Sequence, residues 1–567
     1  AQRLAAALSG DAPRYYWATM TPHDDEDRAR IRRHVADRAG MGFVTVERSF
    51  DLPGGLGEID RNGTVLAGNV TSYSVFARPN AVSDKPYAAE VLSSIFSLDK
   101  DAFLTKLTTT AVSELTVAKH VDKSLVEELE KFDLAGVYYA RDNTRTYPYA
   151  DLLCQVLGFT STDNSGLTGL EKYYDKYLAG TSGKVLYETD LVGKELEKGT
   201  MYYVPATDGL NVKMTIDYEI QAIAESAMAD AFETYSPASA QCIVLDPSTF
   251  EVLAMVNYPG YDLNDVPRDD NDLLNALSRN NLVSDIYEPG STFKIVTAAI
   301  NVEENLRGNS NAFSLKHVFN SSRTRTVDGT TIKCWSNHAN GKHSNQTLAE
   351  ALNNSCNPCF VDIALSIYDY LEKFNFGKST GLDFSGEAQG MLLTESAVRD
   401  CDLARIGFGQ TIAVSALQLA CAGAAVVNGG YYYQPSLVKE ISSKDNNIRE
   451  VFSPVLKNRT VSEEASRITA SLLEGVVAKG SGNKAYIEGY RVGGKTGTAQ
   501  KYENGVIASG KYVSSFLGFF PADDPQYLAL IIVDEPQGAY YGSVVAAPYA
   551  KTIFQGIIDV KGLAPFE

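Results

Sequence analysis

The sequence predicts an α+β fold, in which a sheet is assembled from strands at both ends of a domain and helices fill the middle. Helical patterns follow residue 291 and precede the later strands, and a predicted helix at about 548–558 closes the chain. Strands separated by so long a helical stretch must meet in space to pair, which is typical of an α+β domain. Five strand-like runs support this prediction, the first two joined by a Pro-Ser turn: 241–246, 252–256, 494–499, 516–520 and 527–533.

Length and composition set the outer limits of this prediction. A chain of 567 residues with 44% hydrophobic and 21% charged residues is typical of a globular protein with two to four domains. The net charge of -19 argues against nucleic acid and against a basic membrane-binding surface. The sequence contains no run of about eighteen or more strongly apolar residues, the length needed to span a bilayer. Because the chain opens at Ala1 without a signal peptide, we expect it to be a fragment whose membrane anchor is missing.

Seven cysteines are too few for a disulfide scaffold, and an odd number leaves at least one unpaired. Cys356 and Cys359 have the spacing of a redox pair, but Asn357 between them belongs to a motif described below, so we do not expect redox chemistry. We expect no metal, because His338 and His343 lack a second ligand pair. No cofactor motif was found.

Residues 1–52 differ from the rest of the chain, since they are rich in arginine and the first lysine is Lys85. Thr21-Pro22 starts a predicted helix with an acidic first turn and a basic second half, and Gly40 ends it. Strand-like runs at 15–20 and 43–47 flank this helix. The order is similar to part of the kinases that phosphorylate adenosylcobinamide, but the phosphate-binding loop of that family is missing. We therefore assign no kinase function and expect a fusion joint near residue 52.

Residues 53–206 are predicted to form a separate domain without catalytic chemistry. Leu125, Val126, Leu129 and Phe132 recur at helical spacing and mark one face of an amphipathic helix. Nothing in this region suggests catalytic chemistry, so we expect a spacer and a partner-binding surface.

Residues 207–567 contain the candidate chemistry, which begins with Ser291-Thr292-Phe293-Lys294. Ser291 would lie in the first turn of a buried helix, where free N–H groups and the helix dipole favour a developing anion. A spacing of three puts Lys294 on the same face, and a neutral lysine amine can take the proton of a serine nucleophile. Taken alone, this spacing more often belongs to a capped helix with a solvated lysine.

A second polar motif, Ser355-Cys356-Asn357, precedes another helical pattern. Residues two apart in an extended or looping backbone point the same way, so the Ser355 hydroxyl and the Asn357 amide can reach one pocket. The alternative is a helix N-terminus with Pro358 at its first position, and the two interpretations are compatible.

A third motif, Lys495-Thr496-Gly497-Thr498, follows two glycines. Glycines beside a strand let a ligand or another backbone approach closely. Lys495 would add fixed positive charge, and Thr496 and Thr498 could bind a carboxylate. Taken alone, a glycine-rich hairpin with a surface lysine is the better interpretation.

Together the three motifs form a Ser-x-x-Lys, Ser-x-Asn, Lys-Thr-Gly set, similar to that of class A β-lactamases and penicillin-binding proteins. From about residue 53 onward the chain resembles the class B penicillin-binding proteins, the transpeptidases of division, elongation and sporulation. The resemblance implies an N-terminal pedestal or dimerisation domain over 53–206 and a transpeptidase domain, an antiparallel sheet flanked by helices, over 207–567. It includes residues 215–221, 407–410 and 428–430, whereas the family pattern at 56–63 lacks its arginine and one residue.

The resemblance implies a serine D,D-transpeptidase that cross-links peptidoglycan stem peptides through an acyl-enzyme and is acylated by β-lactams. Ser291 would attack the carbonyl between two D-alanines, with Lys294 as the base. Because the reference pKa of lysine is about 10.4, we expect burial and the charge of Lys495 to lower that of Lys294 by roughly three units. The remaining implied roles are proton relay by Ser355, positioning by Asn357, an oxyanion hole from the N–H groups of Ser291 and Thr498, and substrate binding by Lys495, Thr496, Gly497 and Thr498.

Two other functions remain open from the sequence. One is a hydrolase, either a D,D-carboxypeptidase or a β-lactamase, although no glutamate motif for a deacylating water is recognisable. The other is a non-catalytic β-lactam-binding scaffold or sensor. The resemblance also implies the extracytoplasmic face of a bacterial membrane and a glycosyltransferase partner. It favours the division and sporulation branch through Glu288 and Cys356.

Overall fold

The computed structural model describes residues 57–109, 112–187, 201–320, 322–336, 338, 343, 345–364, 367–503 and 506–566, together with the backbone of 14–18 and 43–47. The chain divides into two compact units. The first contains residues 67–148 and 179–211, and the second contains 58–66, 149–178 and 212–567. The domain boundaries at residues 52 and 206 stay predictions.

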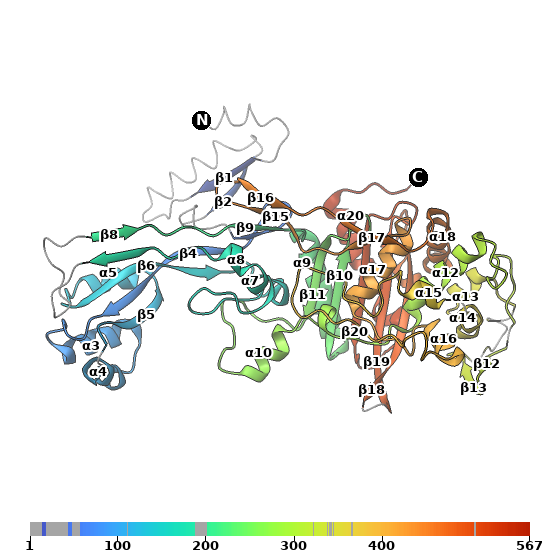
Figure 1. The fold of residues 1–567 in the computed structure, drawn as a ribbon, viewed down its shortest axis with the longest axis horizontal. Coiled ribbons are helices and arrows are strands. Elements are labelled where there is room, and N and C mark those ends of the chain that lie inside the picture. Colours follow the sequence, from blue (N-terminus) through green and yellow to red (C-terminus); the bar gives the residue numbers. More distant parts are fainter. Residues whose placement is uncertain are drawn as a thin grey trace. The chain divides into compact units, whose positions relative to one another are not determined.

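The first unit is built on the long strand β4 (Val65–Ala77), which pairs antiparallel with both β5 (Leu115–Val121) and β6 (Val137–Thr146) (Figure 1). Three helices accompany it: α3 (Lys85–Phe96), α4 (Lys100–Thr109) and α5 (Lys123–Glu130). Their apolar faces share a core with β4 that includes Val75, Leu92, Leu107, Val126 and Leu129. β7 (Lys184–Tyr187) and β8 (Met201–Val204) form a separate antiparallel pair.

The expected amphipathic helix near residue 125 is present, but it ends at Glu130. Val126 and Leu129 are buried as the spacing predicts, whereas Phe132 lies beyond the helix and is 40% exposed. Of residues 1–52, the two expected strands are confirmed as the parallel pair β1 (Arg14–Ala18) and β2 (Phe43–Glu47). The helix predicted between them lies outside the described residues.

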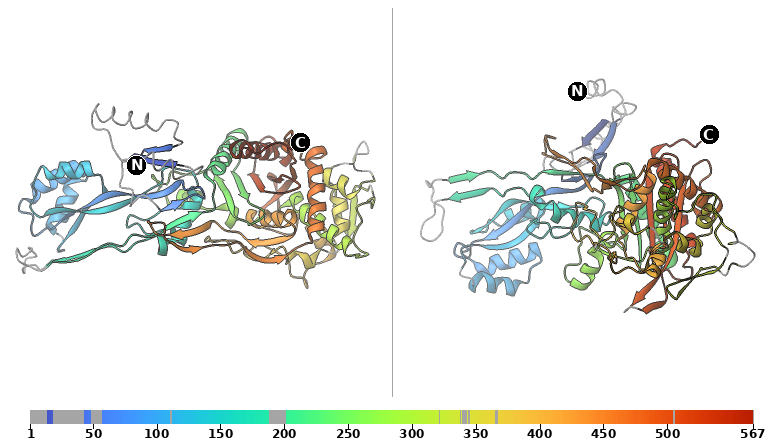
Figure 2. Two further views of the ribbon diagram at one scale, coloured as in Figure 1. Left: turned by 90° about the horizontal axis from the view of Figure 1, so that it is seen from above. Right: turned by 45° about the vertical axis from the view of Figure 1, so that its right-hand side comes forward.

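The second unit is organised around a five-stranded antiparallel sheet in the order β11-β10-β20-β19-β18. Neighbouring side chains on a strand point to opposite faces. Phe516 therefore packs in a core with α9 (Tyr218–Tyr235) and α20 (Ala547–Lys561), while Leu517 faces α17 (Ala416–Val427) near Gly423. Helices thus cover both faces (Figures 1 and 2). The strands are β10 (Ser239–Leu245), β11 (Val252–Tyr258), β18 (Gly493–Glu503), β19 (Val506–Phe520) and β20 (Tyr527–Asp534).

The expected α+β class and all five strand-like runs are therefore confirmed. Strands from the start and the end of the unit meet within the sheet, where β10 pairs with β20. α17 is buried along its whole length. Among the described residues, no helix is both long enough and apolar enough to cross a bilayer.

The helical region between β11 and β18 positions the candidate motifs. Its main elements are the 3₁₀ turn η2 (Gly290–Phe293), α12 (Lys294–Leu306), α13 (Leu348–Asn353), α14 (Asn357–Ala364), α16 (Asp400–Ile406) and α18 (Glu463–Lys479). Short helices and turns complete the second unit: α6 (Cys154–Leu157), α7 (Gly169–Tyr173), α8 (Asp175–Leu178), α10 (Asn271–Ser278), α11 (Asn281–Ser284), α15 (Tyr368–Leu371), η4 (Asn483–Ala485) and α19 (Gly542–Val545).

Smaller strands bring together distant parts of the second unit. β3 pairs parallel with β9, and the antiparallel pairs are β12 with β13, β14 with β17 and β15 with β16. Their bounds are β3 (Glu58–Ile59), β9 (Asn211–Met214), β12 (Thr324–Val327), β13 (Thr330–Lys333), β14 (Tyr431–Gln434), β15 (Val438–Ser442), β16 (Ile448–Val451) and β17 (Val455–Arg459).

Candidate active site

Ser291 lies in the 3₁₀ turn η2, directly before α12, and is partly exposed. Gly290 has a φ of 57°, a left-handed conformation that glycine adopts without strain. Its N–H donates to the Gly409 carbonyl at 2.9 Å. Gly409 is itself left-handed, and a Cβ there would lie 2.0 Å from the Gly290 carbonyl oxygen. Two glycines therefore bring the 409 loop against the turn that carries Ser291.

Lys294 begins α12, one turn after Ser291, and its side chain is fully buried. Its Nζ donates to the Ser355 carbonyl oxygen at 2.9 Å, to Ser355 Oγ at 3.1 Å and to Asn357 Oδ1 at 2.7 Å. Burial lowers the pKa of Lys294 to about 8, because the charged form loses its hydration. A buried lysine held by three acceptors and poised to lose its proton near neutral pH can act as a base.

Ser355 and Asn357 lie at the junction of α13 and α14. Ser355 is left-handed, with a φ of 53°, and this turn of the backbone lets its carbonyl and hydroxyl oxygens face Lys294 together. A non-glycine residue in this conformation costs roughly 1–2 kcal/mol. The Thr347–Glu350 capping box fixes the start of α13. The structure therefore brings two of the three sequence motifs into direct contact.

The third motif lies on β18, at the edge of the sheet and beside the Ser291 turn. A Cβ at Gly497 would meet Thr292 Cγ2 at 3.0 Å, and one at Gly290 would meet Ala499 Cβ at 3.3 Å. No larger residue could replace either glycine without displacing a neighbour. All three motifs thus border one site, although they are spread over about two hundred residues of the sequence.

Lys495 is fully buried, which excludes a hairpin with a surface lysine, the interpretation favoured when the motif is taken alone. Its Nζ donates to the Thr496 carbonyl oxygen at 3.1 Å and to Thr496 Oγ1 at 3.3 Å, and Thr496 Oγ1 donates to Ser481 Oγ at 3.3 Å. Burial, and then the charge of Lys294, hold the pKa of Lys495 well below its ordinary value. Burial therefore opposes the fixed positive charge that we expected of Lys495, and that role stays a prediction.

Thr498 is also engaged, because its hydroxyl accepts a hydrogen bond from the Gly542 N–H at 3.0 Å. A Cβ at Gly542 would lie 2.1 Å from the Gly497 carbonyl oxygen, so the start of α19 packs directly on β18. The Thr498 O–H remains a donor that a ligand oxygen could accept.

The comparisons with known proteins identify two domains in this chain. Residues 240–555 match the family described as the penicillin binding protein transpeptidase domain. Residues 57–214 match the penicillin-binding protein dimerisation domain.

This chain is a class B penicillin-binding protein.

Two curated relatives and one solved structure illustrate the similarity. The penicillin-binding protein is 37% identical over 522 residues to stage V sporulation protein D of Bacillus subtilis, covering 90% of this chain and 79% of the relative. It is 27% identical over 523 residues to the peptidoglycan D,D-transpeptidase FtsI of Escherichia coli, covering 89% and 83%. A peptidoglycan synthetase from Bifidobacterium adolescentis shares the fold, with a TM-score of 0.72, 24% identity and coverage of 91% and 97%.

Sequence reasoning missed two residues that complete the site of this penicillin-binding protein. Ser481 contacts Thr496, and Gly542 contacts Thr498. The only signal for Ser481 was its pair of flanking glycines, of which Gly480 fits closely against Asn353. Gly542 gave no signal, because its contact depends on how the last helices fold over β18.

The expectation that His338 and His343 lack a second ligand pair was wrong. Cys334 and Cys356 come from separate segments and lie beside them, so the four side chains form one group that could hold a metal ion.

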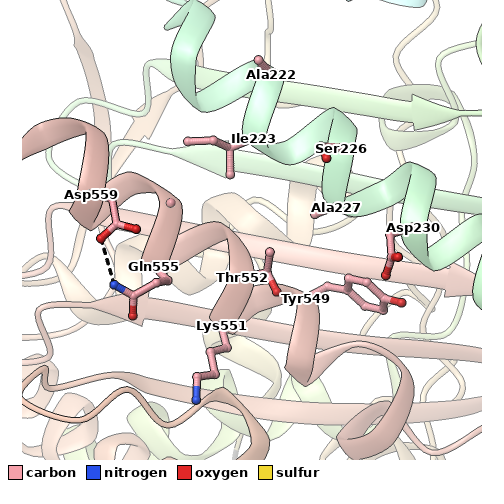
Figure 3. Close-up of a pocket in the computed structure, with 11 residues that line it drawn as sticks. Ala222, Ile223, Ser226, Ala227, Asp230, Tyr549, Lys551, Thr552, Gln555 and Asp559 are labelled. Atoms are coloured by element: carbon pink, nitrogen blue, oxygen red, sulfur yellow. Dashed lines mark hydrogen bonds between the residues drawn. The ribbon is translucent and has the colours of Figure 1, made fainter.

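A groove of about 800 Å³ between α9 and α20 contains none of the motif residues (Figure 3). Its lining includes Ala222, Ile223 and Tyr549, and its Gln555 Nε2 donates to Asp559 Oδ1 at 3.0 Å.

Proposed function

We propose that this protein is a serine-type peptidoglycan D,D-transpeptidase. Ser291 attacks the carbonyl between two D-alanines of a stem peptide, and the terminal D-alanine leaves. An amine of a neighbouring stem peptide then takes the acyl group from Ser291. β-Lactams acylate the same serine, because their ring carbonyl resembles the scissile amide. The observation that carries this proposal is the buried Lys294 amine, held one turn from Ser291 by Ser355 and Asn357.

Lys294 acts as the base in this proposal. With a pKa of about 8, roughly a tenth of Lys294 is neutral at pH 7, compared with fewer than roughly one in a thousand at the ordinary value. The Ser355 hydroxyl, 3.1 Å from the amine, carries the proton onward to the leaving nitrogen. Asn357 holds the amine in place and contacts the substrate amide.

The strand β18 forms the other side of the site. The N–H groups of Ser291 and Thr498 bind the oxyanion, and removing one such donor typically lowers the rate about a hundred- to a thousandfold. Lys495, Thr496, Gly497 and Thr498 bind the substrate backbone and its carboxylate, which favours the protonated form of Lys495. The edge position of β18 supports this role, since an edge strand has unpaired backbone groups that an extended peptide can use.

The names of the relatives support the substrate class and the location. The Escherichia coli relative is named a peptidoglycan D,D-transpeptidase, and the Bacillus subtilis relative is named for a stage of sporulation. We accordingly place the activity at the extracytoplasmic face of the bacterial membrane, with a glycosyltransferase as partner.

Labelling with a fluorescent penicillin, followed by intact-mass measurement, tests the nucleophile. We expect one adduct per wild-type chain and none on Ser291→Ala, while Ser379→Ala, which changes an exposed serine, keeps full labelling. A folded wild-type sample without adduct, or an adduct that survives Ser291→Ala, would refute the assignment. Rapid penicillin turnover would instead favour the hydrolase. Cross-linked product formed from stem peptide and an amine acceptor would favour the transpeptidase.

A further inference from the structure

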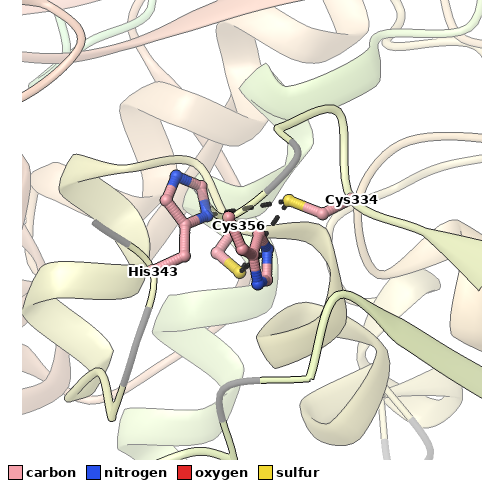
Figure 4. A group of neighbouring side chains, drawn as sticks. Cys334, His343 and Cys356 are labelled. Carbon is pink, nitrogen blue, oxygen red and sulfur yellow. Dashed lines mark hydrogen bonds between the residues drawn. The ribbon is translucent and has the colours of Figure 1, made fainter. Parts of the chain in front are cut away.

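Two cysteines and two histidines converge next to the Ser355–Asn357 segment. Their four candidate ligand atoms, from Cys334, His338, His343 and Cys356, all lie within 4.8 Å of one another. Figure 4 shows Cys334, His343 and Cys356 directed toward a common centre. Cys334, His343 and Cys356 are buried and His338 is partly buried, so the group is not a chance cluster on the surface.

Three of the six distances between these atoms are close to the edges of a tetrahedron around one ion, and all six are at most 4.8 Å. Cys334 Sγ lies 4.0 Å from Cys356 Sγ and 3.7 Å from His343 Nδ1, and Cys356 Sγ lies 3.8 Å from His338 Nε2. With Zn–S bonds of about 2.3 Å and Zn–N bonds of about 2.0–2.1 Å, a tetrahedral site has edges of about 3.8 Å between two sulfurs and about 3.6 Å between sulfur and nitrogen. Each of these three distances is within a few tenths of an ångström of the corresponding edge.

We propose that Cys334, His338, His343 and Cys356 bind one structural zinc ion. Four protein ligands close the coordination sphere, as in structural rather than catalytic zinc sites. Two thiolates and two neutral imidazoles give the complex no net charge, which suits a buried position. His338 and His343 have four residues between them, within the spacing of paired histidines in such sites. Soft sulfur ligands with imidazoles disfavour magnesium, calcium and manganese.

The position of the site indicates a structural role for the ion. Cys356 lies between Ser355 and Asn357, the two residues that hold the Lys294 amine. Trp335 follows Cys334, and its Nε1 donates to the Ser355 carbonyl oxygen at 3.1 Å and to that of Asn354 at 3.3 Å. An ion held by Cys334 and Cys356 would fasten the segment after β13 to the Ser355 turn, and so position the acceptors of Lys294.

A disulfide between Cys334 and Cys356 is the competing interpretation. The two sulfurs are 4.0 Å apart, so they would have to approach by about 2 Å to reach the S–S bond length of about 2.05 Å. Such a bond would leave His338 and His343 without a role and would also remove both thiolates. The two interpretations predict different metal contents and different numbers of free thiols.

Metal content of the full chain, purified without chelators, tests the proposal independently of its transpeptidase activity. We expect one zinc per chain, lost in Cys334→Ser and in His343→Ala and kept in Cys401→Ser, which changes a buried cysteine elsewhere. When the zinc protein is denatured with a chelator and without reductant, all seven cysteines should react as free thiols. Two fewer thiols, or no zinc in a folded sample, would overturn the proposal, as would zinc that remains after Cys334→Ser.

Cobalt substitution keeps the proposal testable if a variant fails to fold. Wild-type protein loaded with Co²⁺ should show the visible absorption of tetrahedral cobalt and thiolate-to-cobalt charge transfer. Spectra of octahedral cobalt would contradict a Cys₂His₂ site. Removal of zinc should slow penicillin acylation by about tenfold or more, and zinc should restore the rate, because supporting contacts of this kind typically matter by 10–100-fold. An acylation rate that does not depend on zinc would refute the positioning role of the ion, but it would not contradict zinc binding.

Discussion

The two sides of the site are built in opposite ways. On the helical side, the Lys294 amine donates three hydrogen bonds: to the Ser355 carbonyl and to the side chains of Ser355 and Asn357. On the strand side, β18 is held by its ladder to β19, with Lys495 opposite Leu517 and Thr498 opposite Ser514, and glycines let it approach the Ser291 turn. Activity should therefore fall when a substitution removes a hydrogen-bonding group on the helical side, or when a substitution adds volume on the strand side.

Lys294→Met should have the largest effect of the changes that test this contrast. Methionine fills a similar volume but cannot accept a proton, so we expect penicillin acylation to slow about 100- to 10,000-fold, the usual contribution of a general base. The measurement is the second-order acylation rate constant across pH.

The pH profile provides the control for this change. Only neutral Lys294 accepts a proton, so the wild-type rate should rise about tenfold per pH unit below 8 and level off above it. Lys294→Met should lose this rise. An unchanged profile in the variant would assign the titrating base to another group.

Gly497→Ala should have the next largest effect, on the strand side. The added Cβ would lie 2.4 Å from Ser515 Oγ and 3.0 Å from Thr292 Cγ2, so β18 and the Ser291 turn must separate. Overpacking of this kind costs about 1–3 kcal/mol, and we expect acylation to slow about tenfold. Acylation kinetics together with thermal unfolding separate the local from the global effect.

Gly475→Ala in α18 is the matched control, because its added Cβ comes no closer than 3.5 Å to any atom outside its own helix. This substitution should keep full acylation and raise stability by roughly 0.5–1 kcal/mol. Equal losses of activity in the two variants would show that the site does not depend on the fit at Gly497.

The smallest expected effect concerns the protonation of Lys495. Its pKa is held well below the ordinary value by burial, and a bound carboxylate would favour the protonated form. Binding of a penicillin to the Ser291→Ala protein should therefore take up part of one proton, and affinity should fall as pH rises. Calorimetry in buffers of different ionisation enthalpy measures this uptake.

Lys495→Arg separates this effect from other titrating groups, since arginine stays protonated throughout the accessible pH range. Proton uptake should disappear in this variant. The same uptake in Lys495→Arg would place the titrating group elsewhere.

Much of the fold could be predicted because its signals are local. The strand-like runs and the helix after Lys294 depend on apolar patterns a few residues long, and the spacing of Ser291 and Lys294 fixes their shared face. The sequence could not predict that Lys495 is buried, because burial depends on which segments pack over β18. The sequence alone does not distinguish a buried lysine of the motif from a lysine on the surface.

The cysteine–histidine group was missed for the same reason. Cys334 and Cys356 are 22 positions apart, and only the fold around β13 and α13 brings them to the histidines. The left-handed Ser355 was equally hidden, since serine has no sequence preference for that conformation. The spacing predicted that Ser355 and Asn357 reach a common pocket, and the family resemblance implied that both contact Lys294 there.

The three acceptors around Lys294 have a consequence for its proton. An ammonium group has three hydrogens and satisfies all three oxygens, whereas a neutral amine has two hydrogens and one lone pair. The Ser355 carbonyl and the Asn357 amide oxygen can only accept, but the Ser355 hydroxyl can rotate its hydrogen toward the lone pair. Lys294 can thus change its charge while every heavy atom around it stays in place, and no contact is left unmade in either state.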